Sequence, residues 1–277
     1  MSASEAADLK LLTDLIQERF GLAFDGVRLE ILGSRLGSRL RELHLQTPRE
    51  YYQYLRFHPD RELEFAQLPP VVTNNETYFF REAHQFDLLA QHVIPERRPV
   101  LGGRPFRVLS AGCSSGEEAY SIGITLQSAA SALAGVSWEI DGCDLNAVRI
   151  EKASAALYEE TSLRCCDQEA RRRYFHPVGP QFQLKEHYRH GVRFFPMNLL
   201  AANGNLGWSR YDAIFCRNLL IYFHEAAFEA LIGHFSRWLA PGGYLFLGHA
   251  ESLLDCKTPF IPVSLPSGVL YRKRAEA

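Results

Sequence analysis

The residues of this chain that are best suited to chemistry gather around one glycine-rich turn. A short apolar run ends at Gly112, and Cys113-Ser-Ser-Gly116 leads into a helical pattern that begins with Glu117 and Glu118. A strand, a glycine turn and a helix in this order open a nucleotide-binding βαβ unit. The glycines let a ligand approach the backbone, and the helix N-terminus faces that ligand. The turn therefore predicts a site for a nucleoside-containing ligand.

A further acidic residue, Asp144, follows the next apolar run at residues 138–143, and Asn146 is placed to cap the helix after it. An acid at the end of the second strand of such a unit can accept hydrogen bonds from both ribose hydroxyls of an adenosine. The turn and this acid together favour a ligand site over a purely structural turn.

Two cofactor classes use this layout, and the local charge distinguishes them. A dinucleotide site expects G-x-G-x-x-G, whereas this chain has Gly112-x-x-x-Gly116 followed by two glutamates. Glu117 and Glu118 would repel a pyrophosphate, but they suit the amino group and sulfonium of S-adenosylmethionine. The charge therefore favours a methyl donor over NAD.

The second half of the chain alternates strand and helix patterns, which predicts a mostly parallel, doubly wound sheet. Ligands of such sheets lie at the carboxyl ends of the strands. Four polar positions fall at or just beyond those ends: Cys113, Asp144, Asn198 and the pair Arg217-Asn218. Residues 260–263 and 269–272 are expected to form a closing antiparallel pair. Residues 182–185 and 192–194 are expected to form a small antiparallel excursion.

Residues 1–70 show helical periodicity and no strand signal. In the helix expected at 26–45, Arg28, Arg35 and Arg39 fall beside a leucine stripe, within about 40° of one another. They are interpreted either as a solvated face or as a docking surface for an acidic partner. A helix is expected at 83–94, followed by a linker at 95–105 with two glycines and three prolines.

Composition excludes several classes of protein. The chain has 277 residues, 30 basic and 32 acidic, with a formal net charge of -2, so a globally basic nucleic-acid binder is not indicated. Six cysteines form no C-x-x-C pair and no zinc pattern, and their scatter suits a reducing compartment. There is no apolar run of the roughly 18 residues of a membrane span. We expect a cytoplasmic protein without a metal, a nucleic-acid partner or direct membrane insertion.

Five blocks of sequence, taken in order, resemble the chemotaxis receptor glutamate methyltransferases, the CheR family. They are NNETYFFRE at 74–82, SAGCSSGEEAYS at 110–121, CDLN at 143–146, FCRNLLIYF at 215–223 and PGGYLFLGHAES at 241–252. The resemblance covers nearly the whole chain and implies its fold. A helical N-terminal receptor-docking domain is expected at 1–80 and a helix and linker at 81–105. A Rossmann-like class I methyltransferase domain is expected at 106–277, with a small inserted antiparallel β-subdomain at about 163–195.

The resemblance also implies the site. Arg81 is expected to orient the substrate carboxylate, and Tyr222 to lie near the transferred methyl group; these are the two catalytic candidates. Glu117 is expected at the glycine turn, although the sequence does not separate it from Glu118. Asp144 should hold the ribose. The implied cofactor-binding set is Asn75, Thr77, Arg81, Glu117, Asp144, Asn198, Leu199, Arg217 and Asn218.

The implied activity is methyl transfer from S-adenosylmethionine to glutamate carboxylates of chemoreceptors, giving methyl esters and S-adenosylhomocysteine in sensory adaptation. The implied partner is the cytoplasmic helical domain of methyl-accepting chemoreceptors, docked through Arg28, Arg35 and Arg39 by a monomer. A glutamate with a pKa near roughly 4.3 is already ionised at pH 7, so the reaction needs no general base. The alternative is a non-catalytic S-adenosylmethionine-binding module. A nucleic-acid methyltransferase and an NAD-dependent oxidoreductase are less favoured.

Overall fold

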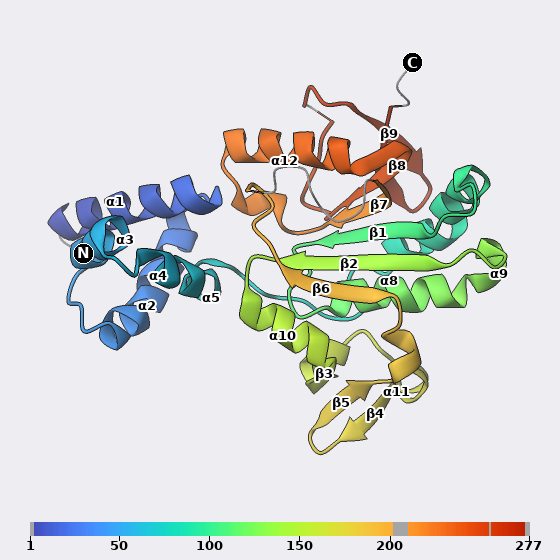
Figure 1. Cartoon of the computed structure of the whole chain (residues 1–277), viewed down its shortest axis with the longest axis horizontal. Helices are drawn as coiled ribbons and strands as arrows, with labels where there is room; N and C mark the ends of the chain where they lie inside the picture. Colours follow the sequence, from blue (N-terminus) through green and yellow to red (C-terminus); the bar gives the residue numbers. More distant parts are fainter. Residues whose placement is uncertain (1–2, 202–209, 255, 275–277) are drawn as a thin grey trace. The chain divides into compact units, whose positions relative to one another are not determined.

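The computed structural model describes residues 3–201, 210–254 and 256–274, and it divides into two compact units (Figure 1). The helical unit contains residues 1–74 and 222–230. The sheet unit contains residues 75–221 and 231–277. The chain therefore leaves the helical unit at Asn74 and returns to it for nine residues after the strand Tyr211–Cys216 and the short loop that carries Arg217.

The helical unit is built from short amphipathic helices. They are α1 (Ala3–Phe20), α2 (Gly26–Glu42), α3 (Pro48–Phe57), α4 (Arg61–Gln67) and α5 (Pro69–Val72). α3 begins at Pro48 because the hydroxyl of Thr47 accepts a hydrogen bond from the Glu50 N–H, at 3.2 Å. Apolar residues one turn apart, such as Leu12 and Ile16 on α1, are fully buried and form the core.

A buried carboxylate joins three of these helices. Glu64 on α4 is only 4% exposed, and its Oε1 accepts a hydrogen bond from Arg39 Nε on α2, at 2.8 Å. The hydroxyl of Tyr51 on α3 donates to the same oxygen, and burial together with this bond raises the pKa of Tyr51. A buried charge is tolerated only when it is paired and hydrogen-bonded, so the helical unit depends on this triad.

We predict that Glu64→Gln lowers the free energy of unfolding by about 3 kcal/mol, because Arg39 then loses its buried counter-charge. Chemical denaturation followed by circular dichroism measures the change. Glu62→Gln is the control, since the pair of Glu62 with Arg19 is exposed and should cost less than about 1 kcal/mol. Equal losses in the two variants would show that the triad has no special role.

The sheet unit contains a seven-stranded sheet in the order β6-β2-β1-β7-β8-β10-β9 (Figure 1). Its strands are β1 (Phe106–Ala111), β2 (Trp138–Asp144), β6 (Val192–Pro196), β7 (Tyr211–Cys216), β8 (Leu239–Leu247), β9 (Phe260–Leu265) and β10 (Gly268–Lys273). Strands β6, β2, β1, β7 and β8 pair in parallel, and β10 and β9 close the sheet as antiparallel strands. The expected doubly wound sheet and its closing pair are confirmed.

Helices follow the strands and bury the faces of the sheet. They are α8 (Glu117–Ser128), α9 (Ala130–Leu133), α10 (Ala147–Ala155) and α12 (Glu225–Trp238). α8 contributes Ala119, Ile122 and Leu126 to a core that also contains Val108 of β1 and Ile140 of β2. Because β1 and α8 are both anchored in this core, the glycine turn between them is held at the carboxyl edge of the sheet.

The expected linker at 95–105 is helical over its first half. α6 (His84–Leu88) continues through a π-helical turn (Leu89–Val93) into α7 (Ile94–Arg97) and a 3-10 turn (Arg98–Val100). Pro95 lacks an N–H, and the chain widens the preceding turn so that Ile94 N–H donates to Leu89 O. The sequence predicted that the helix would end before Pro95, but it continues through this proline. Only the stretch after Val100 connects the helix to β1.

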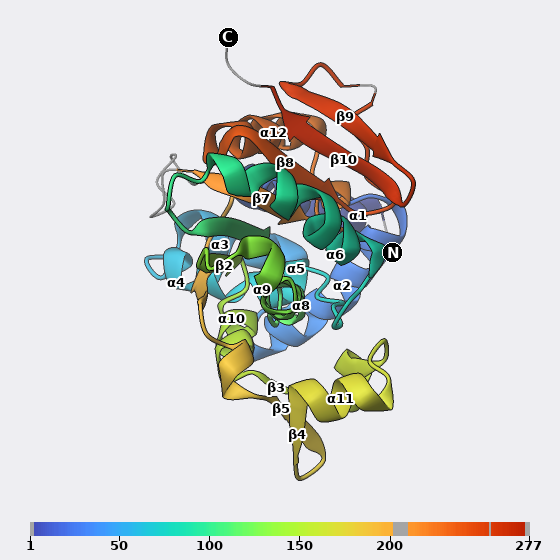
Figure 2. The same ribbon diagram turned by 90° about the vertical axis from the view of Figure 1, so that its right-hand side faces the viewer.

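The small antiparallel sheet differs from the expected pairing. It contains β3 (Leu157–Tyr158), β5 (Gln181–Leu184) and β4 (Phe175–Val178), in the order β3-β5-β4, and α11 (Gln168–Tyr174) precedes β4. Residues 182–185 were expected to pair with residues 192–194, and that prediction is wrong. The latter belong to β6 and pair with β2 in the main sheet. Both views show the small sheet and α11 projecting from the main sheet (Figures 1 and 2).

Candidate functional site

The glycine turn has the left-handed backbone that its sequence predicts. Gly112 has φ 80° and Gly116 has φ 90°, and Ser114 between them has φ 48°. A Cβ added at Gly116 would lie 2.8 Å from the Cβ of Ala153, so only glycine fits against α10 there. The N–H of Gly112 donates to Cys143 O at 2.8 Å, which fastens the turn to the end of β2.

Asp144 holds the turn from the neighbouring strand. Its Oδ2 accepts a hydrogen bond from Ser114 N and its Oδ1 from Asn146 N, both at 2.8 Å. Burial raises the pKa of Asp144, although these two N–H groups partly oppose the rise. Each carboxylate oxygen keeps a second lone pair, so Asp144 can still accept hydrogen bonds from ribose hydroxyls. Asn146 caps α10 as expected, accepting from Val148 N and Arg149 N.

The two glutamates after the turn point to different surroundings. Glu117 is 1% exposed, and its carboxylate accepts hydrogen bonds from the hydroxyls of Ser115 and Ser162, each at 2.9 Å. Glu118 instead accepts a hydrogen bond from Ser110 Oγ at 2.7 Å and pairs with Arg217. Burial raises the pKa of both carboxyls. Glu118, rather than Glu117, therefore lies beside the polar side chains that follow β7.

Arg217 is the centre of a buried ionic cluster at the end of β7. Its side chain is 2% exposed, with Nη1 3.1 Å from Glu118 Oε2 and Nη2 3.4 Å from Glu82 Oε2. Nη2 also donates to Arg81 O, while Nε is buried and has no hydrogen-bond partner among the described residues. Burial opposes ionisation of Glu82, but His249 and Arg217 outweigh it and lower the pKa of this carboxyl. The cluster thus holds Arg81 and Glu118 at one place.

Glu251 shapes the loop after Arg217, and our sequence analysis gave it no role. Its carboxylate accepts hydrogen bonds from the N–H groups of Asn218, Leu219 and Leu220, at 2.8, 2.8 and 2.7 Å. It also accepts one from Gly248 N at 2.7 Å. Asn218 has φ 54°, an unusual conformation that this ring of N–H donors stabilises. Glu251 belongs to the block PGGYLFLGHAES, so the sequence marked it as a candidate. Its hydrogen-bond donors lie on two separate loops, however, and sequence spacing does not show that these loops meet.

The segment that enters the sheet unit is anchored by its aromatic residues. Phe79 is fully buried among Tyr158 and Phe175, with ring centroids 4.8 and 4.9 Å apart. Its anchoring places Asn75, whose carbonyl accepts a hydrogen bond from Ser114 Oγ at 3.4 Å. Arg81 donates from Nη1 to Glu76 O at 3.1 Å. Asn75 therefore lies beside the glycine turn, and Arg81 lies beside the Arg217 cluster. Thr77, between them in the chain, is half-buried.

Asn198 and Leu199 follow β6 and lie near the end of β2. Met197 N donates to Asp144 O at 2.7 Å, which brings this segment to the strand end that carries the acid. Asn198 Oδ1 accepts a hydrogen bond from Leu200 N at 3.0 Å, and Leu199 is buried. The structure thus gathers the expected cofactor residues of the sheet unit at one edge, with Glu117 directed away from Arg217.

Tyr222 and the three expected docking arginines belong to the helical unit. The hydroxyl of Tyr222 accepts a hydrogen bond from Asn74 Nδ2 at 3.0 Å, and the Arg28 guanidinium lies 5.0 Å from the centre of its ring. Arg35 donates to the carbonyls of Val71 and Thr73, at 3.2 and 2.7 Å. Arg39 is bound by Glu64. Arg28, Arg35 and Arg39 were expected to form one docking face of the helix. Instead, each of the three side chains contacts a different partner.

A parallel sheet whose glycine turn and strand-end acid meet at its carboxyl edge defines a nucleoside-binding α/β protein. The family described as "CheR methyltransferase, SAM binding domain" matches residues 75–269, and "CheR methyltransferase, all-alpha domain" matches residues 7–68. The chain belongs to the CheR methyltransferase family. It is an S-adenosylmethionine-dependent methyltransferase, as the sequence predicted.

Three relatives each match most of the chain. The chemotaxis protein methyltransferase of Klebsiella aerogenes is 35% identical, over 92% of this chain and 86% of that protein. Chemotaxis protein methyltransferase 1 of Pseudomonas aeruginosa is 31% identical, over 99% of this chain and all of that protein. The probable biofilm formation methyltransferase WspC of Pseudomonas aeruginosa is 36% identical over 95% of this chain, which spans only 61% of WspC.

One solved structure illustrates how far structural likeness extends. Magnesium protoporphyrin IX methyltransferase (ChlM) from Synechocystis PCC 6803, determined with bound SAM, is 16% identical with a TM-score of 0.39. The match covers 82% of this chain and 91% of that one. The family assignment does not depend on so distant a likeness.

Two other kinds of feature are absent from the described residues. No helix in that part of the chain is long and apolar enough to cross a membrane. No group of three or more His, Cys, Asp or Glu side chains among the described residues is arranged to hold a metal ion.

The residues present fit S-adenosylmethionine. The left-handed turn lets a ligand approach its backbone, and Asp144 lies where an adenosine ribose is bound in folds of this class. Glu118 places a carboxylate beside the turn that can accept hydrogen bonds from a cationic group, and Arg217 Nε, which has no hydrogen-bond partner among the described residues, can donate to an acceptor. A pyrophosphate would meet two carboxylates at the same turn. The structure is therefore consistent with the preference for S-adenosylmethionine over NAD that was inferred from the sequence.

Glu117 should leave a signature in the pH dependence of stability. Because burial raises its pKa in the folded state, the folded chain binds this proton more tightly than the unfolded chain. Glu117 therefore lowers the free energy of unfolding above its raised pKa, and the loss is relieved as the pH falls toward roughly 4.3. We predict that the wild-type chain gains stability relative to Glu117→Gln as the pH falls through this raised pKa toward roughly 4.3.

Chemical denaturation at several pH values measures the effect. Glu151→Gln changes an exposed glutamate of α10 and serves as the control. If the pH profile of Glu117→Gln runs parallel to that of the wild-type chain, Glu117 is not a buried titrating group.

Proposed function

We propose that this chain transfers a methyl group to glutamate side chains of chemoreceptors, forming methyl esters. The observation that carries the proposal is the buried Glu118–Arg217 pair beside the glycine turn, in a chain of the CheR family. Chemotaxis names on several relatives support a receptor substrate. The name of WspC indicates that relatives also serve biofilm formation, so the pathway depends on which receptor the chain meets.

The chemistry needs position more than proton transfer. S-adenosylmethionine supplies the methyl group, and the products are a methyl ester and S-adenosylhomocysteine. A glutamate carboxylate is ionised at pH 7 and is itself the nucleophile, so no side chain has to remove a proton. Arg81 orients this carboxylate, and Tyr222 lies near the methyl group that is transferred. Catalysis then comes from alignment and the exclusion of water.

The cofactor residues take separate parts of the ligand in this proposal. Asp144 holds the ribose, and Asn198 with Leu199 flanks the adenine. Asn75 and Thr77 approach the methionine end, and Arg217 and Asn218 line the cleft. Glu118 replaces Glu117 as the acid that receives the amino group, because Glu118 pairs with Arg217 whereas the Glu117 carboxylate is bound by two serine hydroxyls.

The contacts within the helical unit reduce the number of arginines that are available to dock a receptor. Arg39 neutralises the buried Glu64, and Arg28 lies over the ring of Tyr222, so both have structural partners. Arg35 is exposed although it binds two backbone carbonyls, and it is the best remaining candidate to meet the acidic face of a receptor. Such a contact acts mainly on association rate and weakens with salt.

Methyl labelling tests the activity. The full chain, labelled S-adenosylmethionine and purified cytoplasmic fragments of receptors from the same genome should give receptor-bound label that alkali releases as methanol. Alkali-stable label would indicate methylation of nitrogen rather than of a carboxylate. If the chain binds S-adenosylhomocysteine but no receptor fragment is labelled, the non-catalytic binding module becomes the better account.

Replacing each glutamate in turn tests which one contacts the cofactor. We predict that Glu118→Gln weakens S-adenosylhomocysteine binding by about 10-fold or more, since a charged hydrogen bond contributes about 1.5–3 kcal/mol. Glu117→Gln is the matched control and should change the affinity less than about 3-fold. Calorimetric titration of both folded variants measures the difference, and the reverse order of effects would restore Glu117 to the site.

A further inference from the structure

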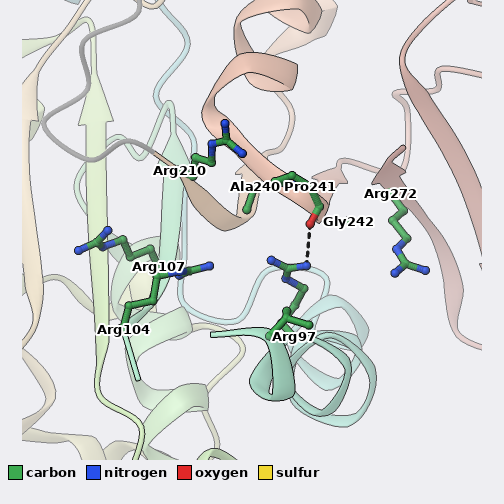
Figure 3. Close-up of a pocket in the computed structure, with 9 residues that line it drawn as sticks. Arg97, Arg104, Arg107, Arg210, Ala240, Pro241, Gly242 and Arg272 are labelled. Carbon is green, nitrogen blue, oxygen red and sulfur yellow. Dashed lines mark hydrogen bonds between the residues drawn. The ribbon is translucent and has the colours of Figure 1, made fainter. Parts of the chain in front are cut away.

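A pocket lined by arginines lies at the end of the main sheet opposite the glycine turn, and Figure 3 shows the residues that line it. It has a volume of about 530 Å³ and is formed where β1, β7 and β8 begin and β10 ends. Five arginines line it: Arg97, Arg104, Arg107, Arg210 and Arg272. None of them belongs to the cofactor site. β1 rises about 3.3 Å per residue, so its two ends lie roughly 17 Å apart.

Two of these arginines are fixed by one buried carboxylate. Asp212 is fully buried, and its Oδ1 lies 2.9 Å from Arg97 Nη2 while its Oδ2 lies 2.7 Å from Arg104 Nη1. Arg97 is itself 6% exposed and donates from Nη1 to Pro241 O at 2.8 Å. Two guanidinium groups share a single negative charge here, so one positive charge is left over in a rigid setting.

The other three arginines add to this surplus. Arg107 pairs with Glu139 at 2.9 Å, and Arg272 pairs with Glu96 at 2.9 Å. Arg210 is exposed and makes no ion pair with any described residue. Among the described residues, the ion pairs of these five guanidinium groups involve three carboxylates, those of Asp212, Glu139 and Glu96, so positive charge exceeds negative charge around the pocket in that part of the chain.

Gly242 allows two of the guanidinium groups to converge. It has φ 70°, and a Cβ built on it would lie 3.1 Å from Arg97 Nη1 and 3.4 Å from Arg272 Nη2. A side chain at this position would therefore crowd Arg97 and touch Arg272. Neutralising Asp212 needs one arginine and leaves the second guanidinium that binds it unexplained.

We propose that this pocket binds a small molecule that carries two or more phosphate groups. Arginine binds phosphate oxygens through paired N–H donors, and several guanidiniums around one pocket suit adjacent phosphates better than one carboxylate. The volume of the pocket lies in the range of small-molecule sites. Because the pocket and the glycine turn lie at opposite ends of β1, the ligand and the cofactor bind at the same time.

Calorimetric titration of the full chain with inorganic pyrophosphate tests the proposal. At fixed ionic strength we expect saturable binding of one pyrophosphate per chain, with orthophosphate weaker. Arg210→Gln removes no ion pair with the described residues and should weaken pyrophosphate by about 10-fold. Arg272→Gln should do the same. Arg172→Gln, an exposed change on α11, is the matched control and should bind as the wild-type chain does.

A second ligand class and a second readout complete the test. ADP binding tighter than pyrophosphate would identify a nucleotide, whereas equal binding would identify the phosphates alone as the ligand; both support the site. S-adenosylhomocysteine affinity should be unchanged in Arg210→Gln. Absence of saturable pyrophosphate binding, equal affinity in Arg210→Gln and Arg172→Gln, or binding of an acidic peptide without pyrophosphate binding would each overturn the proposal.

Discussion

The placement of Arg217 between Glu118 and Glu82 is the interaction on which the candidate site depends. Burying an arginine to 2% exposure is costly without partners of opposite charge, and the two carboxylates that pair with Arg217 come from the helix after the glycine turn and from the segment that enters the sheet unit. One side chain therefore joins three pieces of chain at the carboxyl edge of the sheet. The unpartnered Nε leaves this cluster one donor short of complete hydrogen bonding, as expected where a ligand is to bind.

The loops around this cluster are held by carboxylates rather than by apolar packing alone. Asp144 receives N–H groups from the turn and from the start of α10, and Glu251 receives five from the loops after β7 and β8. Such bonds fix backbone conformations that the residues would otherwise avoid, for example at Ser114 and Asn218. These hydrogen bonds therefore stabilise the loop conformations that position the residues of the candidate site.

Local spacing predicted the parts of the site that depend on neighbours in the sequence. The glycine turn, the strand-end position of Asp144 and the cap by Asn146 all follow from residues within a few positions of one another. Spacing did not distinguish Glu117 from Glu118, because one residue is about 100° of helical rotation and only the surrounding fold decides which side faces Arg217. The role of Glu251 depends on donors about 30 residues away.

Tertiary contacts also explain the two predictions from the sequence that differ from the structure, the shared arginine face and the pairing of residues 192–194. The arithmetic of a helical wheel put Arg28, Arg35 and Arg39 on one face. It could not show that Arg39 would meet Glu64, or that Arg28 would meet Tyr222. Likewise, an alternating pattern at Val192 fits an edge hairpin and a parallel strand equally well, and pairing with β2 decided between them.

The central claim is that Glu118, placed by Arg217, receives the amino-acid end of the cofactor. The most direct test compares two ligands on the wild-type chain and on Glu118→Gln: S-adenosylhomocysteine, and methylthioadenosine, which lacks the amino and carboxylate groups. Calorimetry should show that the variant loses affinity for S-adenosylhomocysteine while its affinity for methylthioadenosine stays unchanged. Equal losses for the two ligands would contradict the account, because Glu118 would then act on the adenosine or on the fold.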